Sequence, residues 1–288
     1  MRYDVESGIT FHPFNFNGCN SMTSDPQYLH NPDADASEVM WRSVEGEFPN
    51  GSDPLSGGAP RYWVPIPSAE LREASSVADM GIWYAIGEAW SQIAIRVSKV
   101  DKPRILDIGC GSGKMARFFA MIPGATYLGI DIFKPAIEWS QAAFKPLPNF
   151  AFTHFDIHSP LYNGSGKLDV TTARVPAPTA SFDLIICGSL FTHLLEPAFK
   201  HYLGEVARCL SNQGRAVVST HNEPQKGKRF SGKETRIDIS DAYMLKLAQS
   251  HGLRLVEKVG TVFSQEVFVF ERMKPHRPRW WRVLRKHP

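Results

Sequence analysis

Residues 105–119 read ILDIGCGSGKMARFF, and this stretch decides the fold class. An apolar run precedes a glycine-rich turn, and a helical pattern follows the turn. A strand, a glycine turn and a helix in this order can hold a nucleotide, a dinucleotide or another ligand that ends in adenosine. The spacing of the residues in the turn distinguishes these three ligands.

A nucleoside triphosphate is excluded first. Its P-loop needs a glycine, four further residues and then Gly-Lys-Ser/Thr. Gly113 and Lys114 match the end of that motif, but Ile108 stands in place of its first glycine. Met115 replaces the hydroxyl residue that would bind magnesium, so the turn is not a P-loop.

A dinucleotide is disfavoured by the same turn. Its fingerprint is Gly-x-Gly-x-x-Gly, which Gly109 and Gly111 begin, but the third glycine comes one residue early, at Gly113. Asp107 lies two residues before Gly109, where its carboxylate would repel a pyrophosphate and attract an ammonium group. S-adenosylmethionine joins adenosine to an amino acid without a phosphate. The turn therefore favours this ligand, with a dinucleotide oxidoreductase as the weaker alternative.

The rest of the chain alternates strands and helices. Apolar runs typical of strands occupy residues 104–108, 125–131, 150–155, 182–187 and 214–220. Helical patterns lie near residues 113–121, 134–144 and 197–210, and a last helix begins after Ser240 and ends near Gly252. Two strands, 253–259 and 265–272, follow, and their short connection predicts an antiparallel pair. The pattern predicts a doubly wound α/β fold with a mostly parallel, seven-stranded sheet.

The chain divides into three parts. Residues 1–67 are rich in Pro, Gly, Asn, Asp and Ser and predict an irregular arm. Residues 68–272 form the expected domain, with a leading helix capped by Ser68 and a long loop over 159–180. Residues 273–288 form a basic tail with two tryptophans, and its segment 275–288 suits a peripheral membrane contact. A disordered end and a contact to an acidic partner are the alternatives.

Bulk properties limit the partners and the compartment. A net charge of +3, with 43% hydrophobic and 21% charged residues, is typical of a globular protein and predicts no nucleic-acid partner. No signal peptide is evident, and no apolar run approaches the roughly 20 residues that span a bilayer. The cysteines form no CxxC pair, which predicts reduced thiols in a cytoplasm; they are Cys19, Cys110, Cys187 and Cys209.

Four landmarks in order resemble the class I S-adenosylmethionine-dependent methyltransferases. Asp-x-Gly-x-Gly-x-Gly at 107–113 resembles motif I of that family, and Asp131 and Asp156 end the second and third predicted strands. FDLIICGSLFTHL at 182–194 resembles motif IV, and YLGEVARCLSNQGRAVVST at 202–220 resembles the following helix, turn and strand. The resemblance covers about residues 100–271 and implies a methyltransferase that binds S-adenosylmethionine.

The resemblance implies a cofactor site formed by Asp107, Gly109, Cys110, Gly111, Asp131, Ile132, Asp156, Ile157, Gly188 and Ser189. Gly109 and Gly111 would let the backbone approach the methionine part, which Asp107 would orient through its amine. Asp131 would hold the ribose hydroxyls, and Asp156 would reach the adenine amino group. All lie where strands of an open α/β sheet end, which is where such sheets bind ligands.

The remaining site residues carry open alternatives. Ile132 and Ile157 would flank the adenine, but both could be ordinary core residues. Asp156 could be a plain cap of a helix or loop. Gly188 and Ser189 would line the pocket of the donated methyl group.

His193 is the candidate catalytic residue. It lies six residues beyond Cys187, the end of the fourth predicted strand, and could serve as the general base that takes a proton from a hydroxyl acceptor. A histidine that only packs or caps the next helix is the alternative. His154, Asp156 and His158 alternate along a strand, but they predict no metal site because Asp156 already has a role in cofactor binding.

Two further stretches look like a bacterial subgroup associated with glycan and small-molecule biosynthesis: PNFAFTHFDIHSPLYNGSG at 148–166 and SLFTHLLEPAFKHYLGEVARCL at 189–210. This resemblance implies O-methylation of a sugar or another small metabolite, with the loop 159–180 and the N-terminal arm as walls of the acceptor site. A non-catalytic S-adenosylmethionine-binding regulator or partner subunit is the alternative. The sequence predicts no oligomeric state.

Overall fold

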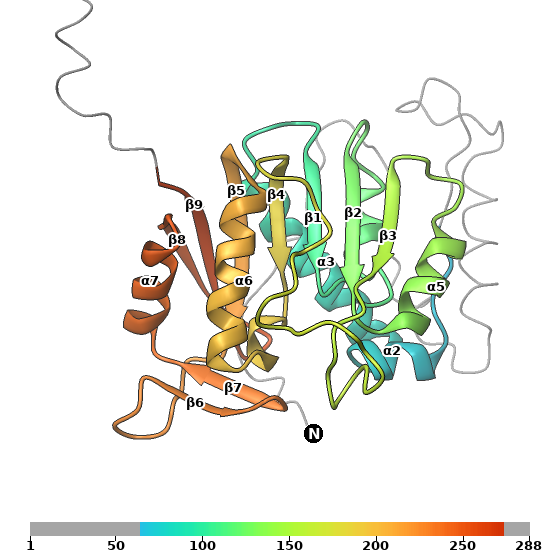
Figure 1. The fold of residues 1–288 in the computed structure, drawn as a ribbon. Coiled ribbons are helices and arrows are strands. Elements are labelled where there is room, and N and C mark those ends of the chain that lie inside the picture. Colours follow the sequence, from blue (N-terminus) through green and yellow to red (C-terminus); the bar gives the residue numbers. More distant parts are fainter. Residues whose placement is uncertain (1–63, 274–288) are drawn as a thin grey trace, which may run out of the picture.

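The computed structural model describes residues 64–273 of the 288-residue chain. Its main sheet has seven strands in the order β3-β2-β1-β4-β5-β9-β8 (Figure 1). These strands are β1 (Arg104–Ile108), β2 (Thr126–Asp131), β3 (Phe150–His154), β4 (Phe182–Cys187), β5 (Leu210–Thr220), β8 (Leu253–Val262) and β9 (Gln265–Arg272). β1 to β5 run parallel, whereas β9 runs antiparallel to both β5 and β8. The predicted α/β fold and its antiparallel last pair are confirmed.

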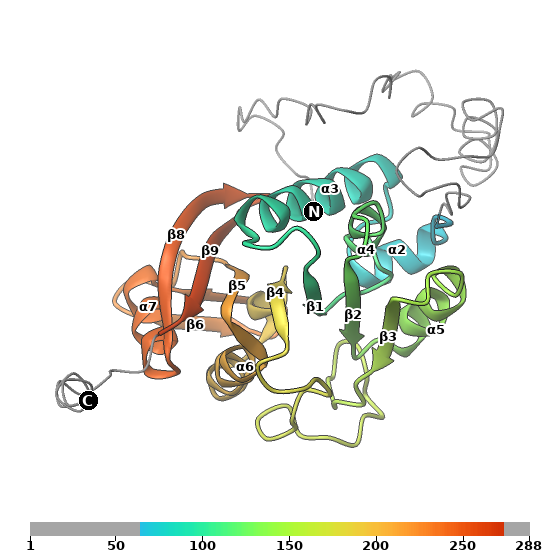
Figure 2. The same ribbon diagram turned by 90° about the horizontal axis from the view of Figure 1, so that it is seen from above.

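Helices cover both faces of this sheet (Figures 1 and 2). The helices are α2 (Ala69–Ser75), α3 (Met80–Val97), α4 (Ala116–Phe119), α5 (Lys134–Ala143), η2 (Phe191–His193), α6 (Glu196–Cys209) and α7 (Asp241–Ser250). Buried side chains of α3, α4 and α5 form one hydrophobic core with the sheet. Those of α6 and α7 form a second core on the opposite face. The sheet is therefore buried on both sides, which explains its continuous apolar strands.

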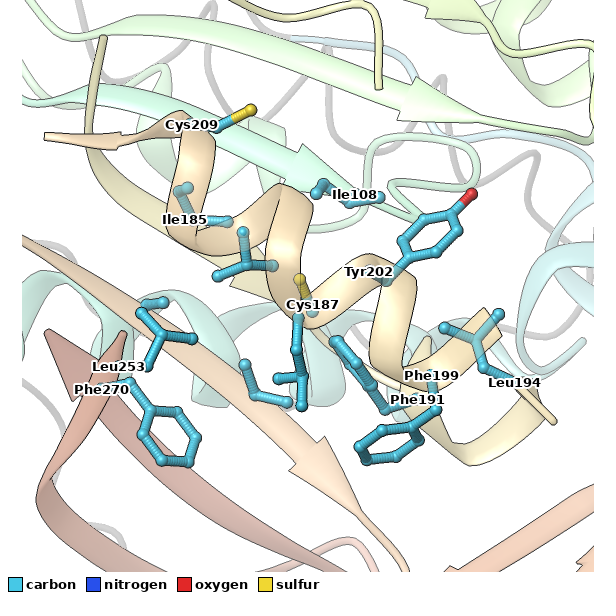
Figure 3. Close-up of a cluster of buried hydrophobic side chains, with 14 of the residues drawn as sticks. Ile108, Ile185, Cys187, Phe191, Leu194, Phe199, Tyr202, Cys209, Leu253 and Phe270 are labelled. Atoms are coloured by element: carbon cyan, nitrogen blue, oxygen red, sulfur yellow. The ribbon is translucent and has the colours of Figure 1, made fainter. Parts of the chain in front are cut away.

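The core beneath α6 is drawn in Figure 3. Phe199 of α6 packs edge-on against Phe191 of η2, with their ring centroids 4.6 Å apart. Cys187, the last residue of β4, is fully buried in the same cluster. This packing fixes the short helix η2 on the sheet directly after β4.

The leading helix is broken in two, which corrects the single helix that its apolar spacing predicts. Ser68 caps α2 as predicted, since its Oγ accepts a hydrogen bond of 3.4 Å from the Leu71 amide. The chain then leaves the helix after Ser75, and Asp79 starts α3 by accepting 2.8 Å from the Ile82 amide. A second capping side chain can begin a new helix within an apolar pattern that is otherwise continuous.

A second sheet of two strands, β6 (Phe230–Lys233) and β7 (Arg236–Ile239), was not predicted. These strands form an antiparallel hairpin between β5 and α7, at the lower edge of the molecule in Figure 1. Gly232 makes the close approach possible, because a Cβ there would lie 2.1 Å from the Arg236 carbonyl oxygen. The two strands, FSGK and RIDI, have only four residues each, which is too short for a clear periodic signal, so the pattern did not reveal them.

The predicted long loop between β3 and β4 covers part of the second core without a helix. Val175 and Ala177 are buried in that core. Arg208 of α6 donates hydrogen bonds of 2.9 and 2.8 Å to the carbonyl oxygens of Val175 and Ala177. Glu205 accepts 2.8 Å from the Val175 amide and pairs with Arg208 at 2.6 Å. This ion pair therefore pins the loop to α6.

Replacing Arg208 with Met is expected to lower the free energy of unfolding by about 2–4 kcal/mol, because the partly buried Glu205 carboxylate loses its partner. The matched control is Arg96→Met, whose ion pair with Glu257 is exposed. That variant should lose under about 1 kcal/mol. Urea unfolding followed by circular dichroism measures both. Equal losses in the two variants would contradict the pinning role of Arg208.

Several sequence predictions fall outside residues 64–273. They are Cys19, nearly all of the N-terminal arm 1–67, and the membrane contact through 275–288. Within the described part of the chain, no helix has the length and apolar character needed to cross a bilayer. Cys110, Cys187 and Cys209 are free and buried there.

Candidate cofactor and acceptor site

The strand ends that carry the predicted site meet at one edge of the sheet. Asp107 of β1 lies in register with Gly129 of β2, and Asp131 lies in register with His154 of β3. Asp156 follows β3 by two residues. β1 lies between β2 and β4, so the chain reverses its winding direction here. Such a switch point is where open α/β sheets bind their ligands.

The glycine turn has the backbone that its sequence predicts. Gly109, Gly111 and Gly113 all have positive φ angles, of 85°, 53° and 71°. α2 packs against the turn, because a Cβ on Gly111 would lie 3.2 Å from Cβ of Ser75. The side chain of Cys110 is buried, so this residue can offer a ligand only its backbone. A side chain at Gly109 or Gly111 would strain the turn.

Asp107 is fully buried at the base of the turn. Its Oδ2 accepts a hydrogen bond of 2.7 Å from the Tyr127 hydroxyl, whereas its Oδ1 has no partner within residues 64–273. Burial raises the pKa of Asp107 to about 7, against the opposing effects of the Tyr127 hydrogen bond and the charge of Lys114. A buried carboxylate oxygen without a partner fits a ligand that brings an ammonium group.

Asp131 has both carboxylate oxygens held by backbone amides. Oδ2 accepts 2.7 Å from the Gly111 amide, and Oδ1 accepts 2.8 Å from the Phe133 amide. Burial raises the pKa of Asp131, and these amides act in the opposite direction. Each carboxylate oxygen can accept a second hydrogen bond. Asp131 can therefore bind two ribose hydroxyls while it still holds the glycine turn.

Asp156 has a partner that the sequence did not reveal. Asn163 Nδ2 donates 3.2 Å to Asp156 Oδ1 and 3.0 Å to the Ile157 carbonyl oxygen. Gly166 packs on the same backbone, since a Cβ there would lie 2.3 Å from that carbonyl oxygen. The start of the long loop thus folds back on the segment that should hold adenine. Asn163 leaves the other oxygen of Asp156 available to an amino group.

The two predicted adenine neighbours differ in exposure. Ile157 is 1% exposed and belongs to the hydrophobic core beneath α6. Ile132 is partly buried and packs against the same core. Core packing, the alternative for both residues, therefore describes Ile157 better than Ile132. Contact of either side chain with adenine stays a prediction.

Gly188 and Ser189 lie directly after β4, where the methyl-donor pocket was predicted. Ser189 has a φ of 59°, and its amide donates 2.8 Å to Oγ of Ser219 on β5. Gln265 of β9 completes the network, because it accepts 2.7 Å from the Ser219 hydroxyl and donates 2.8 Å to the Ser189 hydroxyl. Ser219 and Gln265 therefore hold a strained turn in place. Neither was predicted from the sequence.

His193 ends η2 and has one ring nitrogen fixed. Its Nδ1 lies 2.7 Å from the carbonyl oxygen of Glu234, in the turn of the β6–β7 hairpin. A carbonyl oxygen only accepts, so Nδ1 carries the hydrogen and Nε2 is left as the basic nitrogen. Tyr162 of the long loop stands edge-on to the ring, with centroids 5.9 Å apart. Burial raises the pKa of the Tyr162 hydroxyl, and the charge of Asp131 acts in the same direction.

The family is settled by a comparison with known proteins. A family model described as a methyltransferase domain matches residues 82–267, more than half of the chain. The chain belongs to the class I S-adenosylmethionine-dependent methyltransferases. S-adenosylmethionine is therefore its cofactor, and the preference of the glycine turn for this ligand is confirmed.

Solved structures of this methyltransferase fold agree in topology at low identity. The 1,6-didemethyltoxoflavin-N1-methyltransferase of Burkholderia thailandensis, solved with S-adenosylhomocysteine, has 16% identity and a TM-score of 0.51, over 73% of this chain and 92% of that one. The PH0226 protein of Pyrococcus horikoshii has 15% identity and a TM-score of 0.50, over 80% and 98%. The [4+2]-cyclase SpnF has 14% identity and a TM-score of 0.50, over 73% and 98%. At such identities the likeness shows the fold alone.

His154, Asp156 and His158 form no metal centre in this methyltransferase structure. Among residues 64–273, no group of three or more His, Cys, Asp or Glu side chains is arranged to hold a metal ion. Asp156 instead faces Asn163. Contact of Asp156 with the adenine amino group stays a prediction.

Replacing Asn163 with Ala is expected to weaken S-adenosylmethionine binding about 3- to 10-fold, less than the loss of a direct charge-assisted hydrogen bond, because Asn163 acts through Asp156. The carboxylate of Asp156 would lose the donor that orients it. Ser181→Ala, which changes a partly buried residue just past the far end of the same loop, is the matched control. Isothermal titration calorimetry measures both variants. An unchanged dissociation constant for Asn163→Ala would contradict this role.

Proposed function

We propose that this methyltransferase transfers a methyl group to a hydroxyl group of a sugar, a glycan precursor or another small metabolite, with His193 as general base. One observation carries the proposal: His193 Nδ1 is held at 2.7 Å by the Glu234 carbonyl oxygen, which leaves Nε2 free to take a proton. A hydroxyl acceptor needs such a base, because its proton must leave as the methyl group arrives.

The cofactor side uses the carboxyl ends of β1, β2 and β3. Asp107 offers its unpartnered oxygen to the ammonium group, Asp131 binds the ribose hydroxyls, and Asp156 accepts from the adenine amino group. When bound, S-adenosylmethionine supplies a sulfonium-activated methyl group, and loss of that group leaves S-adenosylhomocysteine. The protein contributes alignment and exclusion of water rather than covalent chemistry.

The acceptor side begins at His193. Nε2 takes the hydroxyl proton while the acceptor oxygen forms its bond to carbon, and the imidazolium then releases that proton to water. The Glu234 carbonyl oxygen stabilises the imidazolium through Nδ1–H throughout. Tyr162, which stands edge-on to His193, forms one wall of the acceptor site in this proposal.

The sugar-like acceptor class is supported by two observations. Residues 148–166 and 189–210 resemble the subgroup associated with glycan and small-molecule biosynthesis. The segment 159–168 of the long loop lies over the site through Asn163 and Gly166, as expected of an acceptor wall. A small acceptor could reach His193 beside this loop.

Transfer of labelled methyl tests the proposal. The protein is incubated with methyl-labelled S-adenosylmethionine and a panel of methyl glycosides, nucleotide sugars, phenols and amines. Product NMR then identifies the methylated atom. We expect label on the oxygen of a hydroxylated probe. Label only on nitrogen, or cofactor binding without any transfer, would contradict the proposal; the latter result would indicate a regulatory or partner subunit.

A further inference from the structure

His221 is a second histidine at the same edge of the sheet, and the mechanism above does not use it. It directly follows β5, and it bridges to Asp238 of β7. Its Nδ1 lies 3.0 Å from the carbonyl oxygen of Ser264, in the turn between β8 and β9. Since that oxygen only accepts, Nδ1 carries the hydrogen and Nε2 is the basic nitrogen. Within residues 64–273, Nε2 of His221 has no hydrogen-bond partner.

His193 and His221 therefore share one arrangement. Each ring donates from Nδ1 to a backbone carbonyl oxygen, and each presents a basic Nε2. The β6–β7 hairpin contacts both histidines. The Glu234 carbonyl oxygen in its turn binds the His193 ring, and β7 pairs with the backbone of His221. Two rings held by backbone groups are fixed in orientation, which a ligand site requires.

A hydrogen-bond network joins the strand ends that carry the two histidines. Ser189, four residues before His193, is bonded to Ser219, two residues before His221. Gln265 bonds to both serines, and it directly follows Ser264, which holds the His221 ring. The family resemblance predicts that Ser189 lines the methyl-donor pocket. The network therefore ties the orientation of His221 to the site of methyl transfer.

The surroundings of His221 favour its neutral ring, in which Nε2 can accept a hydrogen bond. Burial lowers the pKa of His221, and the hydrogen bond to Ser264 acts against this. Arg236 and His193 also lower the pKa, whereas Asp238 raises it. A neutral imidazole at neutral pH accepts a hydrogen bond through Nε2.

We propose that His221 is an acceptor-binding residue that receives a hydrogen bond from a second hydroxyl group of the substrate, while His193 takes the proton from the hydroxyl that is methylated. This inference rests on the proposed function and narrows its substrate class to polyols such as sugars. Two basic ring nitrogens, on histidines whose supporting backbone segments are joined, suit a ligand with two hydroxyl donors. A ligand with a single hydroxyl would leave one of them without a donor.

Isosteric variants test this assignment. In His221→Asn the amide nitrogen can still donate to Ser264, while the Nε2 acceptor is lost; His221→Gln returns a polar group near the Nε2 position. His251→Asn, at the end of α7, is the matched control. Each full-length variant is assayed for labelled methyl transfer to methyl glucoside, UDP-glucose and their singly deoxygenated analogues. Histidine ¹⁵N NMR on the wild type with S-adenosylhomocysteine reports the tautomers.

We expect the Nδ1–H tautomer at both His193 and His221. His221→Asn should raise KM for a polyol at least tenfold with kcat changed under threefold, and His221→Gln should recover part of this. The control should match the wild type. An Nε2–H tautomer at His221, an unchanged KM in His221→Asn, or equal transfer to polyols and their deoxygenated analogues would each overturn the inference. Transfer by the wild type to other acceptors but to none of the polyols would overturn this inference alone. Transfer by the wild type to no acceptor at all, or a lack of cofactor binding, would reject the proposed function itself.

Discussion

Replacing Asp107 with Asn is expected to weaken S-adenosylmethionine binding about 10- to 100-fold, the value of a charge-assisted hydrogen bond to the ligand ammonium group. The same change should stabilise the free protein above neutral pH. Burial raises the pKa of Asp107 from its ordinary value of 3.8 to about 7, so the ionised side chain is unfavourable without a ligand. In this account, Asp107 lowers the stability of the free protein and increases its affinity for the cofactor.

The pH dependence follows from the direction of this shift. Between pH 3.8 and about 7, the folded protein holds a proton on Asp107 that the unfolded chain has lost. The contribution of Asp107 to stability is therefore complete below pH 3.8, declines as pH rises through this window, and is constant above it. Cofactor binding shows the opposite trend, because the ammonium group needs the carboxylate. The affinity should fall by up to about tenfold for each pH unit below 7.

Calorimetry in buffers of different ionisation enthalpy measures both the affinity and the proton released on binding. Thermal unfolding at pH 5 and pH 8 measures the stability. The matched control is Asp183→Asn, at the opposite edge of the sheet, where Arg104 holds the pKa of the carboxyl below its ordinary value. That control should keep wild-type cofactor affinity. Binding by Asp107→Asn that matches the wild type at every pH would contradict the role of Asp107.

Replacing His193 with Asn is expected to lower kcat by about 100- to 10,000-fold, the usual contribution of a general base. The Asn amide can still donate to the Glu234 carbonyl oxygen, so the hairpin keeps its contact while the basic nitrogen is removed. Cofactor affinity should stay within about twofold, because the residues proposed to bind the cofactor are unchanged.

Single-turnover transfer of labelled methyl, with the best acceptor of the panel, measures the rate of the chemical step. Calorimetry with S-adenosylhomocysteine checks that the cofactor site is intact. His201→Asn serves as a control, since the His201 ring lies 2.8 Å from the Ala173 carbonyl oxygen and has no role in the proposed proton transfer. A His193→Asn rate within threefold of the wild type would show that this histidine only packs or caps.

The strands, and the meeting of Asp107 and Asp131 at the strand ends, could be predicted because they depend on local pattern and on topology alone. The run FDLIIC defines β4 with its bounds unchanged. Parallel strands end at one edge whatever their side chains do, so Asp107 and Asp131 had to meet there. β5 begins at Leu210 rather than at residue 214, because the polar residues after Leu210 continue the strand past a bulge opposite β4.

The acceptor side could not be predicted, because it depends on contacts between distant segments. Tyr162 and Asn163 gain their roles only when the long loop folds onto the sheet. Glu234 acts through its carbonyl oxygen, which any residue at this turn could supply. Side-chain identity carries little information about such backbone contacts. His221 was visible at the end of a strand, but its partner Ser264 lies 43 residues away.

Calorimetric titration with S-adenosylhomocysteine and, separately, with NAD⁺ tests the central claim, that the carboxyl ends of β1, β2 and β3 form the cofactor site. We expect one site for S-adenosylhomocysteine, no heat with NAD⁺, and loss of binding in Asp131→Ala, whose folding is checked by circular dichroism. Wild-type affinity in a folded Asp131→Ala variant, or binding of NAD⁺ in place of the nucleoside, would contradict the claim.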